Sequence, residues 1–130
     1  LRNVADRPAL ALHRLAEDQN LAADTARALA AGVRQTDFVP DTVCDGLRAV
    51  LGEPNFRILQ AAGAEAAVVD DAATLAAMRL LWQELKQVVE PSSAIALAAV
   101  LAQPQRFAGL RVGVVLTGGN VDLEALPWRA

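Results

Sequence analysis

The stretch LRVGVVLTGGNVDL, residues 110–123, decides which kind of fold this sequence can form. Its first half is a β-branched apolar run, which is typical of a central parallel strand covered on both faces. The run ends in a hydroxyl, two glycines and an amide, at Thr117–Asn120. Ligands of α/β proteins bind at the carboxyl ends of strands, and glycines let a backbone approach a flat ligand closely. The segment therefore predicts either a tight turn or a ligand site, and its spacing alone favours the turn.

Two helices are predicted before this strand. Residues 72–89 place apolar side chains at helical spacing on one face, and Pro91 should end that helix because a proline disfavours helical geometry in the residue before it. Residues 90–104 restart with a serine cap at Ser92 or Ser93 and are apolar nearly all round, so this second helix should be buried.

The remaining elements complete an α/β order. EAAVVDD, residues 65–71, reads as a short strand that runs into a helix cap at Asp70 or Asp71. Helices are expected over the ranges 7–20, 21–32 (ended by Gly32) and 56–63 (ended by Gly63), with a loop over 33–55 that holds one helical turn near 47–51. Two strands make a small sheet for so much apolar surface. We therefore expect part of a larger layered sheet-and-helix domain, or one that needs a partner.

Composition excludes several classes of protein. The chain has 130 residues, enough for one domain, and is 54% hydrophobic. Its net charge of −3 and the lack of a basic run argue against a nucleic-acid partner. No apolar run reaches the length of a membrane span. Cys44 is the single cysteine, which excludes an internal disulfide and favours a cytoplasmic location.

Five segments, taken together, carry a family resemblance. They are TVCDGL (42–47), LGEPNF (51–56), VVDD (68–71), AMRLLWQELKQVVEPSSAIALAAVL (77–101) and GLRVGVVLTGGNVDLEALPW (109–128). In this order they resemble the C-terminal part of fold-type II pyridoxal-phosphate enzymes, in the serine/threonine dehydratase and serine racemase branch. There the matching stretches read T-I-A-D-G-L, V-x-E-P-S-G/S-A and G-V-x-L-S-G-G-N-V-D. The resemblance covers residues 18–128 and implies the layered fold of the tryptophan synthase β family.

The resemblance implies a set of cofactor-binding residues. Thr117 stands where a strand-end hydroxyl binds the pyridine nitrogen of pyridoxal 5′-phosphate, and the branch usually has serine there. The other implied residues are Gly118, Gly119 and Asn120 beside the ring, the Glu90 carboxylate at the pocket, and the Gly46 backbone. For Glu90, an acid favoured by the helix dipole is an equally good interpretation. Cys44 fits a small buried residue better than a nucleophile.

A cation site is a further implication. Some members of the branch bind a divalent cation in E-P-x-x-A-x-D, and the matching stretch here is DQNLAAD. Its oxygen ligands would be Asp18, the carbonyl of Ala22 and Asp24, which suit Mg²⁺ or Ca²⁺. The glutamate and proline of the pattern are missing here, so capping of a helix by Asp24 is the simpler interpretation.

The resemblance also exposes absences. The Schiff-base lysine motif, S-x-K-x-R-G, and the glycine-rich phosphate loop have no match, and the only lysine, Lys86, lies in an unrelated context. We expect residues 18–130 to be the C-terminal part of a cofactor-binding catalytic domain, lacking its N-terminal half, with residues 1–17 unmatched. The chain is then expected to contain no catalytic residue, and the isolated chain should be inactive.

The function that follows is an enzyme part. The complete enzyme would dehydrate and deaminate L-serine, L-threonine or a related β-hydroxy amino acid to a 2-oxo acid and ammonia. A racemase of the same branch, or a non-catalytic α/β interaction module derived from such an enzyme, are the alternatives. The expected partners are a small amino acid substrate, the missing half or a partner chain, and further copies of the chain.

Overall fold

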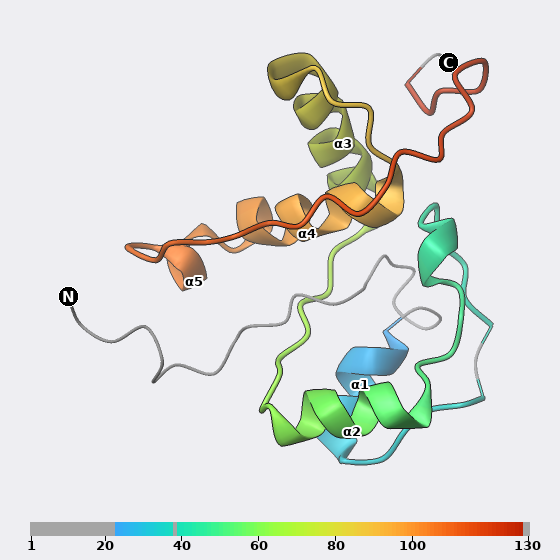
Figure 1. The fold of residues 1–130 in the computed structure, drawn as a ribbon, viewed down its shortest axis with the longest axis vertical. Coiled ribbons are helices and arrows are strands. Elements are labelled where there is room, and N and C mark those ends of the chain that lie inside the picture. Colours follow the sequence, from blue (N-terminus) through green and yellow to red (C-terminus); the bar gives the residue numbers. More distant parts are fainter. Residues whose placement is uncertain (1–22, 38, 129–130) are drawn as a thin grey trace.

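The computed structural model describes residues 23–37 and 39–128. Figure 1 shows the elements, which are α1 (Asp24–Ala31), the 3-10 turn η2 (Asp45–Leu47), α2 (Glu53–Ala61), α3 (Asp71–Leu85), α4 (Pro91–Ala102) and α5 (Pro104–Phe107). The helices α1 and α2 lie together at one end of the molecule, and α3 and α4 cross in the other half. Nothing is described of the predicted helix over 7–20 or of the 1–17 boundary, which lie outside these residues.

Small side chains let α3 and α4 pack closely. Ala77 of α3 and Ala98 and Ala99 of α4 are at most 3% exposed and share one apolar cluster with Cys44. A second cluster joins Met78 of α3 to Ala94 of α4. The pair α1 and α2 has its own small core around Phe56. The C-terminal segment lies on the α3–α4 pair, where Val121 and Trp128 pack against the second cluster (Figure 1).

Local signals fix several helix ends as predicted. Asp70 caps α3, because its carboxylate accepts a hydrogen bond of 2.6 Å from the N–H of Ala73. Gly32 ends α1 with a φ of 68°, in the left-handed region that favours glycine. Gly63, with a φ of 60°, follows the end of α2. These predictions are confirmed. Each could be made from the sequence because it depends on only a few neighbouring residues.

The predicted end of α3 was wrong. The helix stops at Leu85, and Lys86 turns the chain with a φ of 56°, well before Pro91. After this turn the indole N–H of Trp82 donates to the carbonyl of Val89 at 2.9 Å, which holds residue 89 against the helix. Pro91 instead begins α4, where its missing N–H costs nothing.

Two smaller predictions also need correction. Neither Ser92 nor Ser93 caps α4: both lie inside its first turn, and Glu90 occupies the cap position without a side-chain cap bond. The helical turn in the 33–55 loop is η2, at Asp45–Leu47, and α2 begins at Glu53, earlier than predicted.

The predicted strands are not present in the described part of the chain. Residues 64–70 and 110–120 form no helix or strand, and Figure 1 shows both segments as long tubes without arrows. A strand needs a neighbouring segment that supplies a ladder of backbone hydrogen bonds, and no segment of the described residues supplies such a ladder. Val115 is 74% exposed, so the predicted burial on both faces was wrong as well. The described residues therefore do not confirm an α/β sheet.

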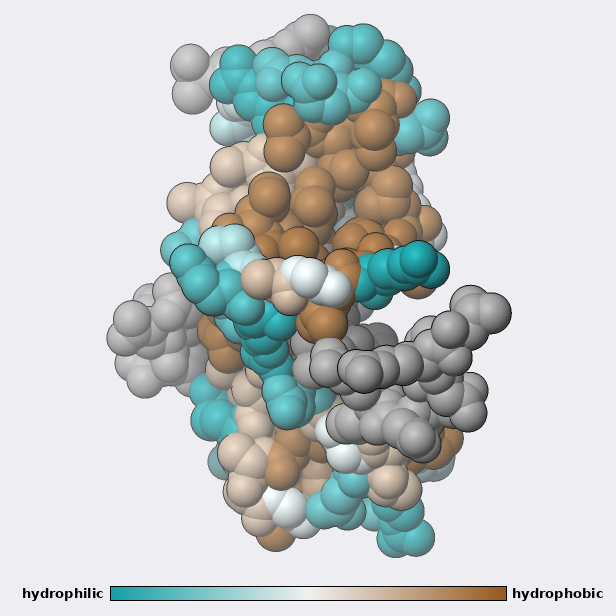
Figure 2. All heavy atoms as spheres, turned by 90° about the vertical axis from the view of Figure 1, so that its left-hand side faces the viewer, coloured by the Kyte–Doolittle hydropathy of each residue, from teal (hydrophilic) through white to brown (hydrophobic). Residues whose placement is uncertain are grey.

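Residues 110–116 leave apolar surface open. Together with α3 and α4 they border a pocket of about 340 Å³, lined by Leu80, Leu81, Glu84, Leu85, Leu97, Val114 and Leu116. Figure 2 shows apolar side chains gathered over the upper half of the molecule, where these elements lie. None of the helices described here is both long and apolar enough to cross a membrane.

Candidate functional site

The start of α4 brings the predicted cofactor residues together. The N–H of Glu90 donates to the carbonyl of Gly118 at 3.0 Å, and the N–H of Asn120 donates to the Glu90 carboxylate at 3.1 Å. On the other side, the N–H of Gly46 donates to the hydroxyl of Ser92 at 3.0 Å. One helix end therefore contacts two segments that lie far apart in the sequence.

The two glycines after Thr117 lie in close contact with the residues that precede α4. A Cβ at Gly118 would lie 2.6 Å from Oε1 of Glu90, and a Cβ at Gly119 would lie 2.6 Å from the carbonyl oxygen of Val88. Real Cβ atoms essentially never approach so closely, so something would have to shift. The segment 117–120 consequently packs directly against residues 88–90. Atoms of Val88 and Glu90 occupy the space that side chains at Gly118 and Gly119 would need.

The Thr117 side chain remains available. Its N–H donates to the hydroxyl of Ser93 at 2.9 Å, but its own hydroxyl has no partner among the residues that the structure describes, and the residue is exposed. A hydroxyl can donate to a ring nitrogen or accept a hydrogen bond. The chemistry of this group therefore fits the pyridine nitrogen of pyridoxal 5′-phosphate.

Glu90 has a visible structural task. Its carboxylate accepts the Asn120 N–H and lies directly against Gly118, while the residue itself occupies the cap position of α4. An acid at a helix start is favoured by the helix dipole. The carboxylate thus holds the 117–120 segment whether or not a cofactor lies beside it.

The loop that carries Gly46 is anchored to the start of α3. The buried Thr42 donates its hydroxyl to the Asp71 carboxylate at 2.9 Å, and the Val43 N–H donates to the same carboxylate at 3.1 Å. Arg48 donates twice to the Thr42 carbonyl, at 2.7 and 3.1 Å. These contacts fix the loop against the start of α3, and the Ser92 hydroxyl holds its Gly46 end on α4.

Cys44 is a packing residue. Its side chain is 0% exposed and belongs to the α3–α4 cluster. Burial raises the pKa of the thiol from 9.0 to about 12, because a charged thiolate would lose its hydration. A thiol that stays protonated is a poor nucleophile. The sequence-based interpretation of Cys44 as a small buried residue agrees with this environment.

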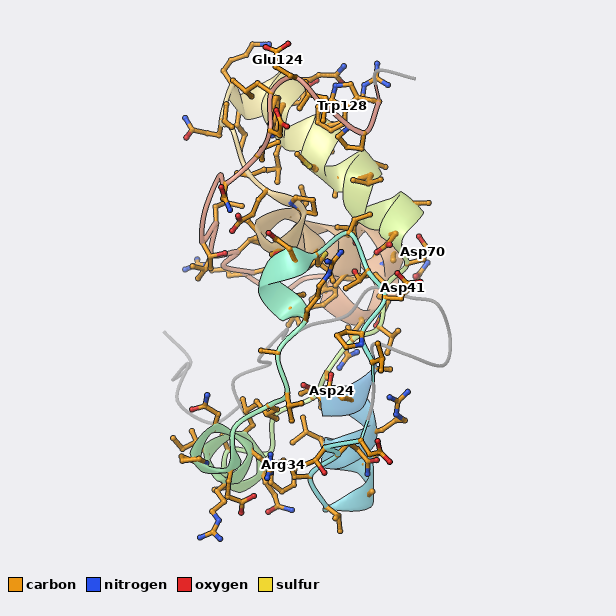
Figure 3. The ribbon with its side chains drawn as sticks, turned by 90° about the vertical axis from the view of Figure 1, so that its right-hand side faces the viewer. Asp24, Arg34, Asp41, Asp70, Glu124 and Trp128 are labelled. Carbon is orange, nitrogen blue, oxygen red and sulfur yellow. The ribbon has the colours of Figure 1, made fainter. Side chains whose placement is uncertain are left out.

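The predicted metal ligands are only partly described. Asp18 and Ala22 lie outside the described residues, and Asp24 begins α1 with 2% exposure. The alternative of a helix cap by Asp24 was wrong, because Ala23 occupies the cap position and no side chain caps the helix. Figure 3 shows Asp24 in the α1–α2 half, apart from Asp70 and Asp41. No group of three or more His, Cys, Asp or Glu side chains that could hold a metal occurs among residues 23–37 and 39–128. The cation site therefore stays a prediction.

The sequence analysis did not predict that Ser92, Ser93 and Asp45 connect the start of α4 to the Gly46 loop and to Thr117. Asp45 accepts the Gly46 N–H at 2.7 Å and lies 3.4 Å from the Ser92 hydroxyl. The available signal was the pair of hydroxyls directly after Glu-Pro, in the first turn of a helix. That signal fits a cap equally well, and only the fold reveals which distant backbone groups the hydroxyls reach. The single lysine, Lys86, instead donates to the Gln83 carbonyl one turn back in α3.

Comparison with known proteins supports the sequence resemblance. The family described as pyridoxal-phosphate dependent enzyme matches residues 9–118. A β-hydroxyaspartate dehydratase of Paracoccus denitrificans is 43% identical, over 88% of this chain and 36% of its own length. A serine racemase of Oryza sativa subsp. indica is 38% identical, over 86% of this chain and 34% of its own.

Solved structures give the same picture. Maize serine racemase superposes with a TM-score of 0.74 at 38% identity, covering 84% of this chain and 34% of that one. A T.th. threonine deaminase gives a TM-score of 0.67 at 39% identity, covering 78% and 37%. The chain thus spans about a third of the length of these relatives. The match to most of its residues shows that this chain belongs to the pyridoxal-phosphate dependent enzyme family, with the fold-type II enzymes as its structural neighbours.

Proposed function

We propose that the chain forms the pyridine-nitrogen side of a pyridoxal 5′-phosphate pocket in an ammonia-lyase for β-hydroxy amino acids. The observation that carries this proposal is the exposed Thr117 hydroxyl, at the end of a segment held on the start of α4. The family membership and the relatives named as a dehydratase and a deaminase support it.

Each residue of the site would have a separate task. The bound cofactor would supply the electron sink for loss of the substrate's α-proton and β-hydroxyl. Thr117 would donate its hydroxyl to the ring nitrogen, and a neutral partner of this kind leaves that nitrogen largely unprotonated. The resulting sink is weaker than one with a carboxylate partner, which suits elimination of water. Glu90 would keep Gly118, Gly119 and Asn120 in place as the wall beside the ring, and Gly46 would line the pocket through its backbone.

The substrate is proposed as a class. L-Serine, L-threonine and hydroxyaspartate share the β-hydroxyl that elimination requires, and the relatives include a β-hydroxyaspartate dehydratase. An amino acid racemase is the second candidate, because serine racemases of rice and maize match at similar identity. The family resemblance implies that recognition of the substrate carboxylate lies mostly in the half of the enzyme that this sequence does not contain, so these residues do not choose among the substrates.

Activity is expected to need residues that this sequence does not contain. Lys86, the only lysine, lies at the end of α3 and its context does not match the family's Schiff-base lysine. We expect the 130 residues alone to form no lysine-linked cofactor adduct and to catalyse nothing. A cytoplasmic location also remains a prediction, resting on the single cysteine.

The experiment that tests the proposal combines intact mass with absorbance. The protein is isolated from its source, weighed, and scanned for the visible band of pyridoxal phosphate bound to a lysine. A mass well above 13.7 kDa together with the band supports an enzyme that includes this chain. A mass of 13.7 kDa without the band contradicts the enzyme proposal and favours the interaction module.

A further inference from the structure

We propose that Ser93 is a positioning residue that aims the Thr117 hydroxyl at the cofactor ring. The inference rests on the proposed function, because it assigns the task of one residue within that same pocket. Ser93 is 1% exposed and lies in the first turn of α4, and its hydroxyl accepts the Thr117 N–H at 2.9 Å. The contact links residues 24 positions apart in the sequence.

The backbone around Thr117 is held on both sides. On its N-terminal side, the N–H of Thr117 donates to the Ser93 hydroxyl. On its C-terminal side, the carbonyl of the next residue, Gly118, accepts the N–H of Glu90 at 3.0 Å. Two glycines follow directly, and glycine gives a backbone more conformational freedom than any other residue. Without these two anchors, little in the local sequence would fix the direction of the segment.

A fixed backbone also fixes the hydroxyl. Threonine is β-branched, so its χ1 angle has few favourable values once φ and ψ are set. The direction of the Thr117 hydroxyl therefore follows from where its N–H is held. A donor that is already aimed at the ring nitrogen strengthens cofactor binding, because no conformational entropy is lost in ordering it when the ligand binds.

The neighbouring residue, Ser92, holds the segment on the other side of the proposed pocket. Ser92 binds the Gly46 backbone at 3.0 Å, whereas Ser93 binds Thr117. Consecutive residues of one rigid helix turn thus hold the two segments that would flank the ring. The family pattern quoted above has glycine or serine at the position of Ser93, and a glycine there has no hydroxyl to offer. The contact is consequently a feature of this chain that the family pattern does not require.

The test measures the ring nitrogen and the Thr117 amide in the cofactor-loaded enzyme, purified from its source with all the residues that accompany this chain. Pyridoxal 5′-phosphate labelled at the ring nitrogen reports its hydrogen bond through its NMR shift, and hydrogen exchange reports the Thr117 N–H. Ser93→Ala should speed that exchange about tenfold and weaken cofactor binding about tenfold. It should also move the ring-nitrogen signal toward that of Thr117→Val. Ser93→Thr, which keeps a hydroxyl, should restore both signals.

Thr74→Val is the matched control. Thr74 is also a fully buried hydroxyl, but it donates to the Asp70 carbonyl at the start of α3. This variant should lose stability without moving the ring-nitrogen signal. If Ser93→Ala behaves like Thr74→Val while Thr117→Val shifts the signal, the role of Ser93 is overturned and the proposed function stands. If Thr117→Val leaves the signal unchanged, the proposed function itself fails.

Discussion

Gly118 and Gly119 show how a single absent side chain can set the geometry of a site. Both glycines face residues 88–90, but they meet different atoms. A Cβ at Gly118 would meet the flexible end of Glu90, whereas a Cβ at Gly119 would meet the backbone carbonyl of Val88. A carboxylate can swing away and lose one hydrogen bond, but a backbone carbonyl can move only if the chain moves with it.

The two substitutions should therefore differ in cost. Gly118→Ala is expected to lower the free energy of unfolding by about 1 kcal/mol, through the lost Glu90–Asn120 bond. Gly119→Ala is expected to cost about 3 kcal/mol, the upper end for overpacking a filled site. Urea denaturation of both variants measures the difference.

Gly113→Ala is the control for these glycines, because a Cβ there would meet nothing within 4 Å. It should leave stability nearly unchanged. Costs for Gly118→Ala and Gly119→Ala that are both as small as that of Gly113→Ala would show that the segment is not packed against residues 88–90.

At the scale of elements, the start of α3 assigns different tasks to two adjacent aspartates. Asp70 caps the helix by accepting the Ala73 N–H, whereas Asp71 accepts from Thr42 and Val43 and holds the loop that carries Cys44. The sequence offered either aspartate as the cap and could not choose between them. Only the second one has partners that lie far away in the sequence.

Replacing each aspartate by alanine separates the two tasks. Asp70→Ala should lower the free energy of unfolding by about 1 kcal/mol, the usual cost of losing a helix cap. It should leave Cys44 unreactive, because burial holds the thiol pKa at about 12. Asp71→Ala should release the loop and make the thiol react faster with iodoacetamide. Equal thiol reactivity in the two variants would contradict this division.

The same scale shows which parts of the fold the sequence could predict. The ends of helices at Gly32, Gly63 and Asp70 depend on neighbouring residues, so local patterns were enough. The end of α3 lies at Lys86, a lysine in the left-handed region that no glycine or proline marks in the sequence. The predicted strands depend on neighbours that the described residues do not supply. Of the site, Thr117 and its glycines were predictable from a motif, whereas the role of Ser93 needed the fold.

At the scale of the whole molecule, the open apolar surface is the dominant feature. Residues 110–116 lie over α4 without a strand partner among the described residues, and Leu85, Val112 and Val115 are all exposed. Large exposed apolar areas mark sites of association, and an unpaired extended segment can accept another chain's backbone. The surface shown in Figure 2 is therefore expected to be covered in the working protein.

This expectation predicts how the 130-residue chain behaves alone. It should self-associate as its concentration rises. Val115 is 74% exposed in the single chain, and its side chain would be buried when two chains associate. Val115→Lys should therefore weaken the association about tenfold or more, because the lysine charge would be buried in the contact. Ile58→Lys is the matched control: Ile58 is 66% exposed on α2, in the other half of the molecule, and its substitution should change nothing. Sedimentation velocity over a range of concentrations measures both. Equal weakening by the two lysines would point to a general effect of charge, and a monomer at every concentration would show that the apolar surface alone does not drive association.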